Sequence, residues 1–98
     1  MAVVIDPDGR ELEALAQVVD FTGLRVLDVG CGDGRLSLRI APEAESVLGI
    51  DADAELIRTA RRETPPDLRD RVEFRKASIV ELDDPPRRFD LVFFTWSL

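Results

Sequence analysis

The stretch from residue 26 to 34, Val-Leu-Asp-Val-Gly-Cys-Gly-Asp-Gly, constrains the fold more than any other part of this chain. Its first four residues are apolar except for Asp28, as in a parallel strand that is buried on both faces. Gly30, Gly32 and Gly34 then allow a tight turn and let a ligand lie close to the backbone. A helical pattern follows, so the free N–H groups at the start of that helix face the turn. A strand, a glycine turn and a helix in this order predict a binding site of the nucleotide type.

The remaining sequence alternates helical and strand patterns. Apolar residues recur with helical spacing over residues 10–20 and 53–64, and two prolines after residue 64 end the second of these helices. The helix after the glycine turn ends near Pro42. Apolar or alternating runs predict strands at residues 24–29, 46–51, 71–75 and 89–95, with one helical turn at 79–82. Residues 1–8 are expected to be irregular.

This order of elements implies right-handed crossovers between parallel strands. A chain of 98 residues makes one domain at most. We therefore predict a single α/β domain over residues 1–98, a Rossmann-like, doubly wound parallel sheet of about four strands with flanking helices.

The composition excludes several classes of function. The chain has no histidine and one cysteine, which removes histidine-based catalysis and a Cys/His metal site, and we predict no metal. One cysteine cannot form an internal disulfide, which favours a cytoplasmic setting. No apolar run approaches the roughly 18 residues that cross a bilayer, and the N-terminus lacks the basic start of a secretion signal. The net charge of −7 argues against a nucleic-acid partner.

The spacing of the glycines separates two kinds of nucleotide site. A dinucleotide fingerprint has the pattern G-x-G-x-x-G, but Arg35 stands at its third glycine position. Asp28 suits a ligand with positive charge better than a pyrophosphate, so a nicotinamide-dependent oxidoreductase is the weaker interpretation. The string from Val26 to Gly34 instead resembles the first motif of class I S-adenosylmethionine-dependent methyltransferases. In that family the acid, the glycines and the following helix hold the methionine end of the cofactor.

Two later segments extend the resemblance. Asp51 ends the second predicted strand, 23 residues after Asp28, where a carboxylate beside the glycine turn can accept the ribose hydroxyls. The alternative is an ordinary helix-capping aspartate. Ile50-Asp51-Ala52 resembles the ribose-binding segment of the family, and residues 72–82 resemble its third strand and adenine-contacting turn. Ser78 stands where many members carry Asp, and it is either an adenine contact or an ordinary turn residue. Ile79 would offer its N–H and apolar surface to the adenine.

Residues 88–97 resemble the fourth strand of the family, and the backbone near Thr95 would approach the methionine part. Thr95-Trp96-Ser97 stands where methylases of amino groups on DNA bases or glutamines carry Asn/Asp-Pro-Pro-Tyr/Phe, so that subclass is not expected. Cys31 is interpreted as a small spacer between glycines rather than a nucleophile. The resemblance thus implies a set of cofactor-binding residues: Asp28, Gly30, Cys31, Gly32, Gly34, Asp51, Ala52, Ser78, Ile79 and Thr95.

The resemblance implies the cofactor-holding half of a methyltransferase, with S-adenosylmethionine as cofactor and a small-molecule acceptor. No residue can be named as the catalytic base, and whether the chain is an enzyme stays open. The alternative is a non-catalytic S-adenosylmethionine-binding module, or a remnant without activity. The family's domain normally has seven strands, and the resemblance stops after the fourth. The strand from Leu91 to Trp96 would then be an exposed apolar edge, through which we expect self-association or a partner chain.

Overall fold

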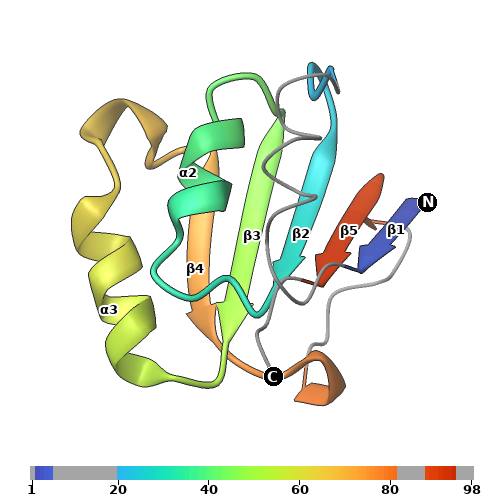
Figure 1. Cartoon of the computed structure of the whole chain (residues 1–98). Helices are drawn as coiled ribbons and strands as arrows, with labels where there is room; N and C mark the ends of the chain where they lie inside the picture. The colour runs from blue at the N-terminus through green and yellow to red at the C-terminus, as the bar shows by residue number, and fades with distance from the viewer. Residues whose placement is uncertain (1, 6–19, 82–87, 95–98) are drawn as a thin grey trace.

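The computed structural model describes residues 2–5, 20–81 and 88–94. Five strands form one sheet in the order β1-β5-β2-β3-β4, and every neighbouring pair is parallel (Figure 1). The strands are β1 (Ala2–Ile5), β2 (Arg25–Val29), β3 (Ser46–Asp51), β4 (Val72–Lys76) and β5 (Leu91–Phe94). The helices are α2 (Arg35–Ile40) and α3 (Ala54–Glu63), with the short 3-10 helices η1 (Pro66–Leu68) and η2 (Ile79–Glu81).

The alternation of helices and strands that the sequence predicts is confirmed from residue 24 onward. β2, β3, β4 and β5 all fall on predicted strands, and no end of these strands differs from the prediction by more than two residues. Asp53 caps α3 as predicted, because its Oδ1 accepts hydrogen bonds from the N–H groups of Glu55 and Leu56. The helix predicted at residues 10–20 lies almost entirely outside the described residues.

The prediction that residues 1–8 are irregular is wrong for Ala2–Ile5. These four residues form β1, which pairs with β5 in the register Ala2↔Leu91 to Ile5↔Phe94. Ala-Val-Val-Ile is rich in β-branched residues, and pairing satisfies backbone groups of β5 that would otherwise be left at an edge. The sheet therefore has five strands rather than about four.

The exposed edge predicted from Leu91 onward is also corrected by this pairing. β5 lies between β1 and β2, and its first three residues are buried. The edges of the described sheet are β1 and β4 instead. The structure thus removes the reason for expecting self-association through β5, while Thr95 and Trp96 lie outside the described residues.

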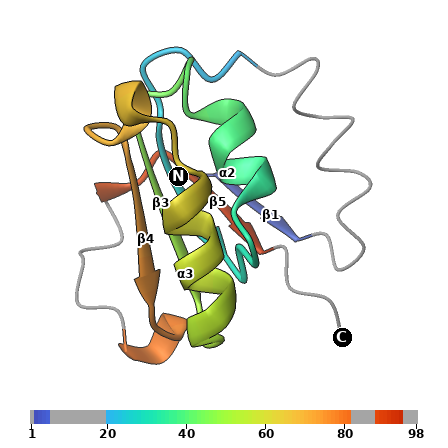
Figure 2. The ribbon, with the colours of Figure 1, turned by 90° about the vertical axis from the view of Figure 1, so that its left-hand side faces the viewer.

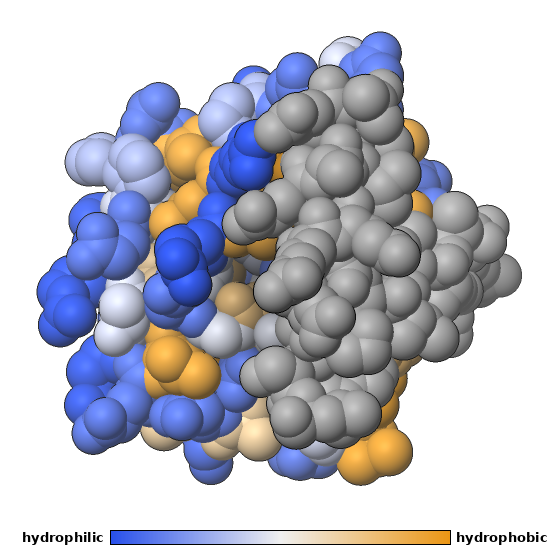
Figure 3. Space-filling model, viewed as in Figure 1, coloured by the Kyte–Doolittle hydropathy of each residue, from blue (hydrophilic) through white to orange (hydrophobic). Residues whose placement is uncertain are grey.

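Alternate residues of β2, β3 and β5 belong to two separate hydrophobic clusters. One cluster lies between the sheet and the helices, and it contains Val26, Val47 and Phe74. The other lies on the opposite face of the sheet, and it contains Leu27 and Leu48. Figure 2 shows α2 and α3 together on the first of these faces. The outward side of α3 is mainly hydrophilic, as its amphipathic pattern predicts (Figure 3).

Candidate binding site at the glycine turn

The glycine turn joins the end of β2 to α2 at the edge of the sheet where the strands end (Figure 1). Gly30, Gly32 and Gly34 have φ angles of 79°, 60° and 84°, a region that glycine adopts far more readily than other residues. The N–H groups of Gly30 and Cys31 both donate to the carbonyl oxygen of Ile50, at 2.8 and 3.0 Å. The turn is therefore fixed to the end of β3.

Asp51, the last residue of β3, connects the turn to the start of α3. Its Oδ2 accepts a hydrogen bond from the N–H of Gly32 at 2.9 Å, and its Oδ1 accepts one from the N–H of Asp53 at 2.8 Å. The residue is half-buried, and each carboxylate oxygen can accept more than one hydrogen bond. The structure brings Asp51 and the turn together at the distance of a hydrogen bond. Its contact with ribose stays a prediction.

Asp28 lies beneath the turn and is only 1% exposed. Its Oδ2 accepts a hydrogen bond of 2.9 Å from the Oγ of Ser37 in α2, and Ser37 is itself fully buried. The carboxylate therefore supports the underside of α2 in this geometry. It also places negative charge close below the turn, where a cationic ligand group would be attracted to it. Direct contact of Asp28 with such a group stays a prediction.

The segment after β4 lies beside Asp51. The N–H of Ala77 donates to the carbonyl oxygen of Asp51 at 3.1 Å, which brings the next two residues to the same edge of the sheet. Ser78 directly precedes η2, and its Oγ donates to Oε1 of Glu81 at 2.9 Å, which is the geometry of a turn residue. Ile79 is 44% exposed and can offer apolar surface there. An adenine contact by Ser78 or Ile79 stays a prediction.

Two further predicted residues lie at the margin of the site. Ala52 is exposed directly after Asp51, at the start of the loop into α3. Thr95 lies outside the described residues, but Phe94 before it pairs with Val29 at the end of β2. The end of β5 therefore reaches the same edge of the sheet as the turn.

Cys31 has the environment of a structural residue. The side chain is buried, and burial, reinforced by the carboxylates of Asp28 and Asp51, raises the pKa of its thiol far above the ordinary value. A thiol with a raised pKa remains protonated at neutral pH and is a poor nucleophile. This environment agrees with the interpretation of Cys31 as a spacer.

The sequence analysis does not identify three residues that lie directly beneath the site: Ser37, Gly49 and Phe74. Ser37 lies on the inner face of α2 with Ile40, so a polar residue at a buried helical position was an available signal. Gly49 interrupts an otherwise apolar strand, which is a sign that another group approaches closely. Phe74 gave no local signal of its own, because its partners come from other segments.

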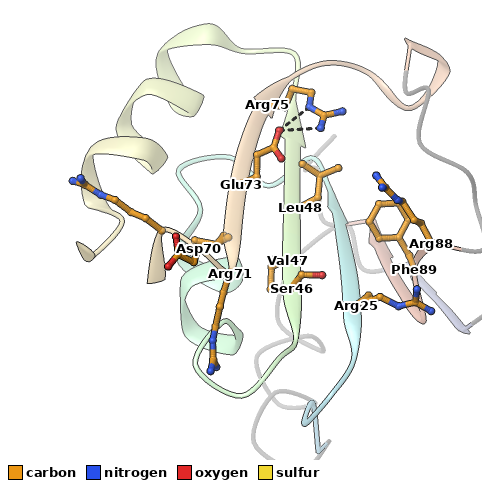
Figure 4. Close-up of a pocket in the computed structure, with 12 residues that line it drawn as sticks. Arg25, Ser46, Val47, Leu48, Asp70, Arg71, Glu73, Arg75, Arg88 and Phe89 are labelled. Atoms are coloured by element: carbon orange, nitrogen blue, oxygen red, sulfur yellow. Dashed lines mark hydrogen bonds and ion pairs between the residues drawn. The ribbon is translucent and has the colours of Figure 1, made fainter. Parts of the chain in front are cut away.

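A hollow of about 520 Å³ lies on the face of the sheet opposite to the helices (Figure 4). Five arginines line it, and two of them make ion pairs with acidic residues. Arg25 donates to both oxygens of Asp90 at 3.1 and 3.3 Å, and Arg75 donates twice to Oε2 of Glu73, at 2.9 and 3.1 Å. The Arg25 guanidinium holds the pKa of Asp90 below its ordinary value. No residue of the glycine turn lines this hollow.

Within the described ranges, no three acidic or Cys/His residues come together in a way that could hold a metal ion. None of the helices described here has the length and apolar character that a bilayer crossing requires.

A model of the family described as "Methyltransferase domain" matches residues 26–98. A magnesium-protoporphyrin O-methyltransferase of Rhodobacter capsulatus is 36% identical over 74 residues, which cover 74% of this chain and 32% of that protein. The rRNA N(6)-adenosine-methyltransferase metl-5 of Caenorhabditis elegans is 36% identical over 86 residues, covering 82% of this chain and 40% of that protein.

A solved structure shows the same arrangement in three dimensions. An S-adenosylmethionine-dependent methyltransferase of Mesorhizobium loti superimposes with a TM-score of 0.68 at 30% identity, covering 86% of this chain and 38% of that one. The chain spans about a third to two fifths of the length of these relatives. The family match includes the glycine turn, Asp51 and β5, which are the features that build the site. The chain therefore belongs to the methyltransferase domain family.

Proposed function

We propose that this chain binds S-adenosylmethionine at the glycine turn and forms the cofactor-holding part of an enzyme that transfers a methyl group to a small molecule. The observation that carries the proposal is the hydrogen bond between Asp51 and Gly32, which fixes a carboxylate beside a turn without side chains. In a parallel sheet, ligands bind in the crevice beyond the carboxyl ends of the strands, where both residues lie.

The backbone at the middle of the turn is accessible to such a ligand. A Cβ added at Gly32 would meet no heavy atom within 4 Å, so the backbone there is open to a molecule lying against it. Asp51 retains lone pairs for the ribose hydroxyls, and Ser78 and Ile79 would lie at the adenine. The carboxylates of Asp28 and Asp51 provide negative charge on both sides of the turn, which suits a sulfonium cation.

When bound, S-adenosylmethionine supplies an activated methyl group on a positively charged sulfur. The task of the protein is then to align this group with the acceptor and to exclude water. The turn and Asp51 would hold the adenosyl part in one orientation. We assign no general base, because the two half-buried carboxylates at the turn, Asp33 and Asp51, already accept hydrogen bonds from backbone N–H groups.

The small-molecule acceptor is supported by two features of the sequence. The net charge of −7 disfavours a polyanionic substrate. Thr95-Trp96-Ser97 also replaces the motif that base-directed amino methylases carry. The relatives differ in this respect, since one is named for a magnesium protoporphyrin and another for an rRNA adenosine. The acceptor therefore needs its own test.

Equilibrium dialysis with labelled S-adenosylmethionine tests the binding. We expect one bound molecule per chain, no displacement by NAD, and an affinity that falls about 10- to 100-fold in Asp51→Asn, because a hydrogen bond to a charged group is lost. Asp70→Asn, at the hollow on the opposite face, is the matched control and should bind normally. An unchanged affinity in Asp51→Asn, or displacement by NAD, contradicts the proposal.

A methyl-transfer assay with the same labelled compound tests the reaction. The label should appear in a small-molecule extract and not in total RNA. Label in the RNA fraction would overturn the small-molecule acceptor. Binding without transfer to either fraction would favour the alternative, a non-catalytic S-adenosylmethionine-binding module.

A further inference from the structure

A row of residues crosses three strands directly beneath the glycine turn. The register places Asp28 opposite Gly49, and Gly49 opposite Phe74. Asp28 contacts Ser37 of α2, and Phe74 belongs to the cluster between the sheet and the helices. The row thus faces the helices, and its middle position carries no side chain.

The ring of Phe74 fills the space that two glycines leave. A Cβ added at Gly49 would lie 2.8 Å from Cδ1 of this ring and 3.0 Å from Sγ of Cys31. A Cβ added at Gly34 would lie 2.6 Å from Cζ of the same ring and 2.9 Å from Cβ of Ala60. Non-bonded carbon atoms in proteins essentially never lie less than 3.0 Å apart. The ring is therefore in contact with β3 and with the end of the turn at once.

The end of the turn lies against this ring. Gly34 begins α2 with a φ of 84° and without a side-chain hydrogen bond to cap the helix. Asp53, by contrast, caps α3 with its own carboxylate. The start of the turn is fixed by Ile50 and its middle by Asp51, while Gly34 donates its N–H to the carbonyl oxygen of Cys31 at 3.0 Å and lies against the ring of Phe74. Close-packed interiors transmit a displacement of such a group to its neighbours.

We propose that Phe74 is a positioning residue for the binding site. Its ring, held over Gly49, sets the position of Gly34 and thereby of the hydrogen bond between Gly32 and Asp51, beside which the ligand would lie. The effect on the cofactor rests on the proposed function, whereas the effect on the turn does not.

Two substitutions test this role as a pair. In Gly49→Ala the added methyl group displaces the ring toward the turn, and in Phe74→Leu the support below the turn is shortened. We expect each to lower the affinity for S-adenosylhomocysteine about tenfold. In the double variant the smaller leucine makes room for the alanine, and the affinity should return to within about threefold of the wild type.

The matched control is Phe93→Leu. Phe93 is a buried phenylalanine of the same cluster and pairs with Asp28 from the other side, but it packs on Phe21 rather than on the glycines. Its substitution should lower the unfolding temperature about as much as Phe74→Leu does and leave the affinity unchanged. A normal affinity in Phe74→Leu overturns the proposal, as does a double variant that binds no better than Gly49→Ala.

A measurement without ligand separates the two proposals. The amides of Gly32 and Gly34, which donate to Asp51 and to Cys31, should exchange with solvent faster in Phe74→Leu and at the wild-type rate in Phe93→Leu. If the wild type does not bind S-adenosylhomocysteine, the proposed function fails, and these exchange rates still decide whether Phe74 positions the turn. Unchanged exchange rates in Phe74→Leu contradict the positioning role.

Discussion

The glycine turn and the arginine-lined hollow satisfy their polar groups in different ways. At the turn, the Asp51 carboxylate is held by backbone N–H groups of Gly32 and Asp53, and no basic side chain is paired with it in the described contacts. At the hollow, Arg25 and Arg75 are each paired with an acidic side chain (Figure 4). Five arginines and two acidic residues line the hollow, and the ion pairs there join Arg25 to Asp90 and Arg75 to Glu73.

This difference in hydrogen bonding distinguishes the two regions as candidate binding sites. Exposed ion pairs at the hollow are compatible with a solvated surface and require no ligand. The turn combines positive-φ glycines, open space at Gly32 and a carboxylate with remaining lone pairs, which leaves both room and hydrogen-bond acceptors for a ligand. Substitutions in the two regions should therefore differ in kind as well as in size.

The largest effect is expected for Gly34→Ala. The alanine would keep an unfavourable φ of 84°, and its Cβ would lie 2.6 Å from Cζ of Phe74. The free energy of unfolding should therefore fall by about 2–5 kcal/mol. Gly23→Ala is the matched control, because Gly23 has a φ of 74° but no heavy atom within 4 Å of an added Cβ. Gly23→Ala should lower the free energy of unfolding by only about 1–2 kcal/mol, which is the cost of the unfavourable φ alone. If urea denaturation gives the same loss of unfolding free energy for both variants, Phe74 does not pack tightly against Gly34.

A smaller effect is expected for Ser37→Ala. This substitution removes a hydrogen bond to the buried carboxylate of Asp28, which should lower the free energy of unfolding by about 1.5–3 kcal/mol. Ser46→Ala, at the hollow on the opposite face, should change it by less than about 0.5 kcal/mol. The two serines can be compared by denaturant unfolding at neutral pH. Similar values would mean that the Asp28–Ser37 contact contributes nothing specific.

The smallest effect is expected for Asp90→Asn at the hollow. Arg25 lowers the pKa of Asp90, so the folded state binds this proton more weakly than the unfolded state does. The stability from this pair is therefore present above the ordinary aspartate pKa of 3.8 and is lost as the pH falls below it. Asp90→Asn should lose less stability than the wild type between about pH 5 and about pH 3. Identical acid profiles would show that the ion pair does not form in solution.

The sequence was sufficient for the features that depend on neighbouring residues. The apolar runs located β2 to β5, and the glycine spacing located the turn, because both patterns are local. β1 could not be found in this way, since four apolar residues become a strand only when β5 is available to pair with them. Phe74 could not be found either, because the register that places it over Gly49 is a property of the whole sheet.

An amide NMR titration with S-adenosylmethionine tests the central claim most directly, since it reports where the ligand binds. We predict saturable shifts at residues 30–34, 51–53 and 78–79, with the signals of residues 69–73 at the hollow unchanged. Shifts centred on the hollow, or no shifts at the turn when the ligand is in large excess, would contradict the account.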